Sequence, residues 1–178
     1  IKLVPFGEFL PLENILRNIG LRNLTNNYQS FSKGNKRNII NINIENFNLK
    51  ILPLICYEII YTGELFEDSN FDLIINISED GWFGESIGPK QHFAHSIVRA
   101  IESGKYVLRS ANNGVAAIVN PLGYVEQKVN FGESGYVDLT ELKKIQPTVF
   151  SKYGNKIFVL LILLYIFLIF SFNRFRNE

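Results

Sequence analysis

Cys56 is the residue whose type and position best suit covalent chemistry. It is the only cysteine among the 178 residues, and it follows the apolar run 49–55 directly. Such a run predicts a buried strand. A side chain where a strand meets a helix can project into a cleft, and nearby backbone N–H groups can stabilise an oxyanion. On the residues alone, both a catalytic nucleophile and an inert packing thiol remain open.

Four further side chains are candidates for the same site. Tyr57 and Glu58 place a phenol and a carboxylate beside the thiol, which a simple core position would not need. Glu8 follows a Pro-Phe-Gly turn, where its carboxylate could face the same cleft or lie on an ordinary surface loop. Trp82, the only tryptophan, is expected in a loop, where it either contacts a substrate or packs as a lid.

Composition excludes several classes of protein. The net charge of +1 gives no basic surface for nucleic acid, and a single cysteine cannot form an intrachain disulfide. His92 and His95 are the only histidines and lie three residues apart, too few ligands for a zinc site without a third partner. We expect neither a metal ion nor a cofactor.

The elements that must position these residues alternate between strands and helices early and form hairpins late. We predict helices over residues 11–20, 59–66 and 89–103. We predict strands over residues 1–4, 39–44, 49–55, 71–77, 106–110, 115–119, 124–129 and 135–139. The polar segment 23–38 is expected to be an exposed loop. This pattern predicts a mixed α/β sandwich.

The composition changes after residue 150. Residues 157–172 carry no charge, and as a helix they would be about 24 Å long, slightly short for a bilayer core. Lys156 and Arg174 can snorkel at the two ends and extend the span. We interpret this segment as a transmembrane helix, with a buried core helix as the alternative. The expected domains are therefore 1–150, a partial catalytic domain, and 151–178, the transmembrane helix with a short basic tail.

Six segments, in order and with matching spacing, resemble the apolipoprotein N-acyltransferase family of the nitrilase, or carbon–nitrogen hydrolase, superfamily. They are Leu3–Leu12, Ile55–Glu58, Asn76–Gly84, Gly88–His92, Arg99–Glu102 and Arg109–Gly114. The resemblance implies the C-terminal half of a nitrilase-like αββα sandwich. It also implies a bacterial inner-membrane protein with a periplasmic catalytic part and a cytoplasmic tail.

The resemblance further implies an activity. A phospholipid would donate a fatty acyl group to Cys56 as a thioester, and an apolipoprotein would accept it on the α-amino group of its N-terminal S-diacylglyceryl cysteine. Cys56 matches the nucleophile, while Glu8, Tyr57 and Glu58 match residues that support the site. Trp82 matches an aromatic residue close to the acyl group.

The chain departs from the family pattern at its start. The family triad is Glu–Lys–Cys, and the glutamate and lysine would both lie upstream of Ile1, with Lys2 two residues too late. The chain contains no methionine and opens within an apparent strand, so we expect it to be active only when an upstream segment of the same enzyme completes it, whether in one chain or as a separate fragment. A carbon–nitrogen hydrolase (amidase) and an inactive remnant of a split gene are the alternatives.

Overall fold

The computed structural model describes residues 3–5, 8–19, 31–32, 34, 38–44, 47–63 and 70–176. The chain divides into two compact units, Ile1–Asn38 and Ile39–Glu178. The predicted domain boundary after residue 150 lies inside the second unit, at the short helix α4 (Val149–Tyr153), and stays a prediction.

The described residues of the first unit include one short helix, α1 (Glu13–Asn18), which confirms the predicted helix over 11–20 with shorter bounds. Leu3 and Val4 belong to no strand, so that part of the predicted strand 1–4 is wrong, and residues 1 and 2 lie outside the described part of the chain. Most of the predicted loop over 23–38 also lies outside it.

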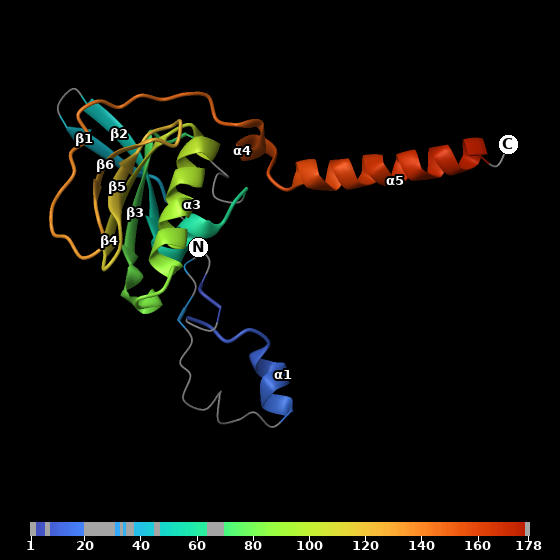
Figure 1. The fold of residues 1–178 in the computed structure, drawn as a ribbon, viewed down its shortest axis with the longest axis horizontal. Helices are drawn as coiled ribbons and strands as arrows, with labels where there is room; N and C mark the ends of the chain where they lie inside the picture. The colour runs from blue at the N-terminus through green and yellow to red at the C-terminus, as the bar shows by residue number, and fades with distance from the viewer. Residues whose placement is uncertain are drawn as a thin grey trace. The chain divides into compact units, whose positions relative to one another are not determined.

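The second unit is built on a mixed six-stranded sheet whose spatial order follows the chain (Figure 1). β2, β3 and β4 pair in parallel, and the flanking pairs are antiparallel. This sheet confirms the predicted α/β class. The strands are β1 (Ile40–Ile44), β2 (Phe47–Ile55), β3 (Leu73–Glu79), β4 (Tyr106–Asn112), β5 (Ala116–Val119) and β6 (Val125–Val129).

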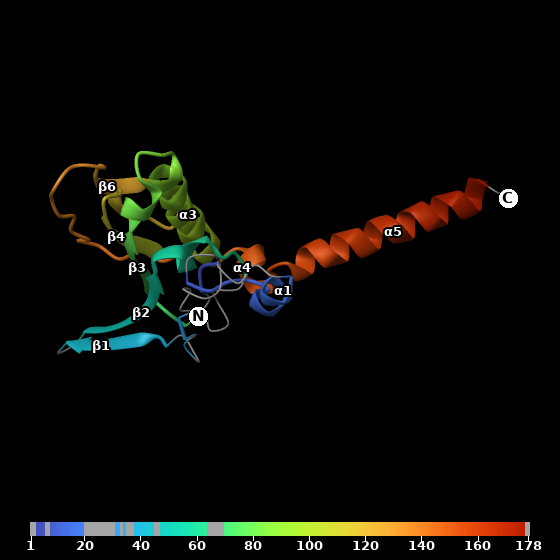
Figure 2. The same cartoon turned by 90° about the horizontal axis from the view of Figure 1, so that it is seen from below.

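The helix α3 (Gly88–Ser103) connects β3 to β4 and covers one face of the sheet (Figure 2). Pro89 lies in its first turn, where a missing N–H costs nothing. Gly104 ends it with φ of +66°, and a Cβ there would lie 2.6 Å from the carbonyl oxygen of Ile145. Both the backbone angle and the close approach therefore require glycine.

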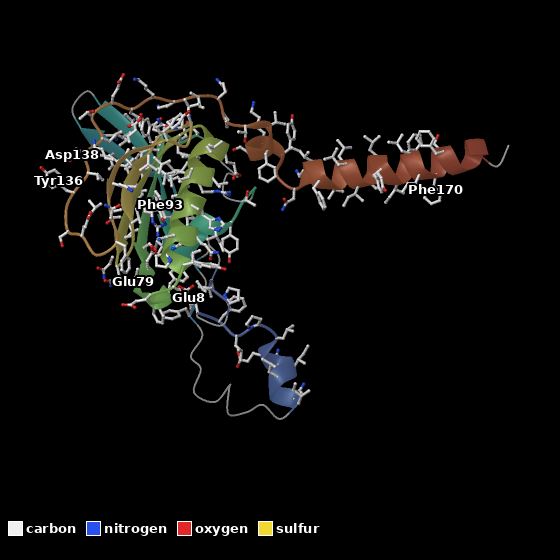
Figure 3. The ribbon with its side chains drawn as sticks, viewed as in Figure 1. Glu8, Glu79, Phe93, Tyr136, Asp138 and Phe170 are labelled. Atoms are coloured by element: carbon white, nitrogen blue, oxygen red, sulfur yellow. The ribbon has the colours of Figure 1, made fainter. Side chains whose placement is uncertain are left out.

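The two faces of the sheet bury separate apolar clusters. On the α3 face, Leu54, Ile74 and Val107 are fully buried, and Phe93 of the helix packs against them (Figure 3). On the opposite face, Val137, Leu139 and Leu142 of the following extended segment pack against a second cluster. The described residues thus form one helix layer and one sheet, which fits half of the expected αββα sandwich.

The predicted strand over 135–139 is wrong, because this segment forms no ladder with β6. Gln127 explains the difference. Its side-chain amide donates to the carbonyl oxygen of Asp138 at 2.8 Å and accepts from the backbone N–H of Asp138 at 3.2 Å. A side chain therefore satisfies the backbone groups that a neighbouring strand would otherwise pair.

The last helix, α5 (Lys156–Arg176), forms where the apolar segment is predicted. Among the described residues, however, no helix is both long and apolar enough to cross a membrane. The predicted transmembrane helix over 157–172 therefore has no support in the described part of the chain, which contains an apolar helix there. The side chains from Phe158 to Phe170 are exposed; Phe170 itself is 70% exposed (Figure 3).

The burial of the α3 face predicts a stability difference within one strand. Ile74 is 0% exposed and Ile77 is 61% exposed, both on β3. Ile74→Ala should lower the free energy of unfolding by about 2–5 kcal/mol, since it leaves a cavity in the core. Ile77→Ala should cost less than about 1 kcal/mol. Urea unfolding followed by circular dichroism measures both, and equal losses would contradict this assignment of the core.

Candidate active site

Cys56 lies directly after β2 and begins the 3-10 helix η1 (Cys56–Ile60). Of the helix predicted over 59–66, residues 59 and 60 belong to η1, residues 61–63 are not helical, and residues 64–66 lie outside the described part of the chain. The thiol is partly exposed, and the backbone φ of Cys56 is +47°. A left-handed conformation of this kind costs a non-glycine residue about 1–2 kcal/mol. Such strain persists only where the surroundings hold it in place.

Three side chains hold Cys56. Asn76 donates to its carbonyl oxygen at 3.3 Å, and Nε2 of His92 lies 3.2 Å from the same oxygen. The hydroxyl of Ser78 contacts the Cys56 sulfur at 3.6 Å. Asn76 also donates to the carbonyl oxygen of Leu54 at 3.1 Å, which links the cysteine to the end of β2. Cys56 is therefore held at both its backbone and its sulfur.

A buried carboxylate lies behind these three side chains. Asp80, in the 3-10 helix η2 (Asp80–Phe83), is 0% exposed. Its Oδ1 accepts from Ser78 at 2.7 Å and lies 2.9 Å from Nδ1 of His92. Arg109 of β4 donates to both carboxylate oxygens, at 2.8 and 2.7 Å, and also contacts the amide oxygen of Asn76. One ion pair thus anchors every group that touches Cys56.

The cluster keeps Asp80 charged. Burial raises the pKa of the Asp80 carboxyl, but the hydrogen bonds from His92 and Ser78 and the charge of Arg109 outweigh it and hold this pKa below its ordinary value. Both ring nitrogens of His92 face oxygen acceptors, Asp80 on one side and the Cys56 carbonyl on the other. The imidazole of His92 therefore bridges the Asp80 carboxylate and the backbone carbonyl of Cys56.

Two of the predicted site residues, Tyr57 and Glu58, lie in η1, directly after Cys56. Glu58 is buried, and its carboxylate accepts the backbone N–H of Ile55 at 2.9 Å, which fixes the turn. Tyr57 stacks edge-on against Tyr61 with ring centroids 5.9 Å apart. Their proximity to Cys56 agrees with the sequence analysis, while their roles in chemistry stay predictions.

The other two predicted residues are placed differently. Trp82 lies in η2 and is 86% exposed, so it packs under nothing in the described part of the chain. Glu8 belongs to the first unit, where its carboxylate accepts the backbone N–H of Val4 at 2.9 Å. Its expected contact with the cleft of Cys56 stays a prediction.

The loop that carries Trp82 is fastened by Glu79, at the end of β3 (Figure 3). The Glu79 carboxylate accepts from the side chains of Asn112 and Asn113 and from the backbone of Gly81. The hydrogen bond from Asn112, with those from Gly81 and Asn113, lowers the pKa of Glu79. The ends of β3 and β4 are therefore joined beside the site.

Five polar or charged residues lie behind Cys56, and none of them has a role that was predicted from the sequence. The usable signal is a polar or charged residue inside an apolar strand, because a buried charge needs a partner. In the sequence, the spacing of His92 and His95 points at most to an incomplete zinc site. In the structure, His95 is not part of the cluster. In the described ranges, no three His, Cys, Asp or Glu side chains are grouped to hold a metal. The five residues are Asn76, Ser78, Asp80, His92 and Arg109.

The whole arrangement lies in a segment that matches a known family, since residues 2–142 match the carbon-nitrogen hydrolase family. The chain belongs to this family. The membership fits a nitrilase-like α/β fold in which a strand-end cysteine is presented beside buried polar groups.

Curated relatives of this carbon–nitrogen hydrolase have a more specific name. The apolipoprotein N-acyltransferases of Rickettsia prowazekii and Rickettsia bellii are both 43% identical to it, over 86% and 94% of this chain. That of Rhizobium rhizogenes is 42% identical over 78% of the chain. The resemblance drawn from the six segments is confirmed. The chain spans about a third of the length of these relatives, namely 30%, 32% and 26%.

Among solved structures, an amidase of the nitrilase superfamily from Nesterenkonia AN1 is similar with a TM-score of 0.45 and 14% identity. The match covers 59% of this chain and 42% of that one. A carbon–nitrogen hydrolase superfamily protein from Xanthomonas campestris is similar with a TM-score of 0.44 and 18% identity, over 64% of this chain and 46% of that one.

The left-handed backbone of Cys56 predicts an unusual stability order. Cys56→Gly should be about 1 kcal/mol more stable than Cys56→Ala, because glycine adopts a φ of +47° without steric cost. Both variants lose the same sulfur contact, so alanine is the matched control. Thermal and urea unfolding measure the difference, and an alanine variant of equal or greater stability would show that no strain is stored there.

The ion pair predicts an acid-sensitive contribution to stability. Asp80→Asn should lower the free energy of unfolding by about 3 kcal/mol at pH 7, since Arg109 is left buried without its partner. The pKa of Asp80 is lower in the folded than in the unfolded chain. Its stabilisation is therefore complete above about pH 4 and is lost as the pH falls through the native pKa.

The measurement is urea unfolding of both proteins between pH 7 and pH 3. The difference between wild type and Asp80→Asn should shrink toward acid pH. Glu141→Gln is the control, because Glu141 is 69% exposed in an ion pair with Lys143 and should change stability by no more than about 0.5 kcal/mol. A difference that stays constant with pH would contradict a charged Asp80.

Proposed function

We propose that this carbon–nitrogen hydrolase carries the acyl-accepting thiol of an N-acyltransferase that acylates apolipoproteins from phospholipid. The observation that carries the proposal is Cys56 itself, partly exposed at the end of a parallel strand and held by polar side chains at its carbonyl and its sulfur. The name of relatives 43% identical to it supplies the acceptor, an apolipoprotein, and the acyl group that is transferred; the phospholipid donor comes from the family resemblance.

The reaction has two half-reactions on one sulfur. The Cys56 thiolate attacks the ester carbonyl of a phospholipid; a C–S bond forms, the C–O bond breaks, and the lysophospholipid oxygen takes the proton that the thiol gave up. The α-amino group of the apolipoprotein's S-diacylglyceryl cysteine then attacks the thioester carbonyl. A C–N bond forms, the C–S bond breaks, and the amine proton returns to the sulfur.

The general base does not come from the cluster behind Cys56. The Asp80 carboxylate is committed to Arg109, and its lowered pKa makes it a weak base at neutral pH. We propose that the glutamate and lysine of the family triad come from a further segment, in the same protein or in a separate chain. The chain's match to about a third of its relatives' length is in keeping with this arrangement.

The donor places the reaction at a membrane surface, which we propose is the periplasmic face of the bacterial inner membrane. A phospholipid ester lies in the interfacial region of a bilayer. The exposed apolar side chains of α5, from Phe158 to Phe172, would gain free energy in contact with lipid. The helix would then hold the catalytic unit close to its donor.

Labelled phospholipid tests the proposal directly. The chain would be placed in phospholipid vesicles with and without the upstream part of a relative, and label on the protein would be read after gel separation. We expect a hydroxylamine-sensitive thioester on wild type when the upstream part is present, and none on Cys56→Ala. Cys56→Ser is the matched nucleophile variant and should lose at least about a hundredfold in rate, because serine lacks the ready thiolate.

The outcomes separate the alternatives that the family leaves open. Release of free labelled fatty acid without transfer to a diacylglyceryl cysteine peptide would favour a hydrolase of the amidase type. An absence of label with the upstream part present would favour an inactive remnant. A thioester formed by the chain alone would show that no further segment is needed.

A further inference from the structure

The Ser78 hydroxyl occupies a position between the nucleophile and the buried charge. Its Oγ lies 3.6 Å from the Cys56 sulfur and 2.7 Å from Oδ1 of Asp80, with Nδ1 of His92 at 3.5 Å. The residue is 7% exposed, so water has little access to this hydroxyl. A hydroxyl has one proton to donate, and here two acceptors compete for it.

Asp80 does not depend on that proton. Oδ1 also has Nδ1 of His92 at 2.9 Å and a guanidinium N–H of Arg109 at 2.8 Å, and Oδ2 accepts from Arg109 at 2.7 Å. If Ser78 turns its O–H away, the carboxylate keeps donors on both of its oxygens. Rotation of the hydroxyl therefore leaves no buried acceptor unsatisfied.

The sulfur, by contrast, gains most from the hydrogen bond when it is charged. A hydrogen bond to an ionised acceptor is roughly twice as strong as one between neutral groups. While Cys56 is a neutral thiol, the short contact to Asp80 holds the Ser78 proton. Once the thiol has lost its proton, the sulfur becomes a charged acceptor within reach of the same hydroxyl.

We propose that Ser78 is a further catalytic residue, whose hydroxyl turns from Asp80 to the Cys56 sulfur and stabilises the thiolate before attack and again when the thioester is cleaved. The inference rests on the proposed function for its place in the reaction. No bond forms to Ser78, and its proton stays on Oγ throughout. The proton of the thiol leaves by the general base and is not relayed through Ser78.

His92 and Asp80 act differently, as positioning residues. Asp80 holds Ser78 at the required distance, and His92 holds the Cys56 carbonyl, which keeps the sulfur turned toward β3. Among the described residues of the second unit, the charged or titratable side chains that hydrogen-bond in the turn of Cys56 or in the cluster behind it are Glu58 on η1, Asp80 on η2, His92 on α3 and Arg109 on β4.

The rate of Cys56 alkylation by iodoacetamide tests the proposal, because the chain has a single cysteine and the reaction needs no lipid. Losing a hydrogen bond to a charged group should reduce the thiolate population roughly ten- to a hundredfold. The higher intrinsic nucleophilicity of the remaining thiolate offsets about half of this on a logarithmic scale. We therefore expect Ser78→Ala to be alkylated about three- to tenfold more slowly at pH 7.

A second pair of variants isolates the hydroxyl. Ser78→Thr and Ser78→Val have nearly the same shape and differ by one hydroxyl, so the threonine variant should react faster by the same factor. The pH profile of alkylation should move to higher pH in Ser78→Ala and Ser78→Val only. Ser110→Ala, an exposed serine on β4, is the control and should match wild type.

Equal alkylation rates and pH profiles for Ser78→Thr and Ser78→Val would overturn the proposal, even if Ser78→Ala folds poorly. The alkylation test of Ser78 and the acyl-transfer test of the proposed function can fail independently of each other. Slower alkylation of Ser78→Ala without any lipid thioester on wild type would keep the role of Ser78 and reject the proposed function. Thioester formation that is unchanged in Ser78→Ala, together with unchanged alkylation, would keep the function and reject the role of Ser78.

Discussion

The ion pair between Asp80 and Arg109 is the interaction on which the site depends. Both side chains are shielded from water, where an unpaired charge would cost several kcal/mol. Every hydrogen bond of the cluster around Cys56 leads back to this pair, either through Ser78 and His92 to Asp80 or through Asn76 to Arg109. The pair also joins β4 to η2, so the strand and the loop that carry these groups cannot shift independently.

The direction of the strands explains why the cluster forms where it does. β2, β3 and β4 are parallel, and the residues that follow or end them meet at one edge of the sheet. Cys56 follows β2 and Ser78 lies near the end of β3, while Arg109 lies in the middle of β4, paired with Asn76 of β3. Open α/β sheets bind ligands outside the carboxyl ends of their strands. A strained backbone at Cys56 is sustained there because three side chains from neighbouring elements fix it.

Much of this architecture was predictable, and the reasons for the failures are physical. The strands and α3 follow from apolar runs and from Pro89 and Gly104, which act locally. The segment 135–139 was wrongly predicted as a strand. The side chain of Gln127, which is distant in sequence, hydrogen-bonds to the backbone of Asp138 in place of a strand partner. Cys56 was predictable as a candidate from its neighbours in sequence. The cluster behind it was not, since Asp80 and Arg109 lie 29 residues apart and only the parallel pairing of β3 and β4 brings them together.

A second buried ion pair links the end of η1, the turn that begins with Cys56, to the short helix α4 that precedes α5. Arg99 pairs with Glu102 at 2.8 Å and donates to the carbonyl oxygen of Tyr61, directly after η1. The Glu102 carboxylate accepts from Gly63, and its backbone carbonyl accepts from Thr148, the N-cap of α4. Arg99 and Glu102 of α3 therefore fix both the end of η1 and the start of α4. The residues after η1 and the start of α4 thus share their hydrogen-bond partners on one helix.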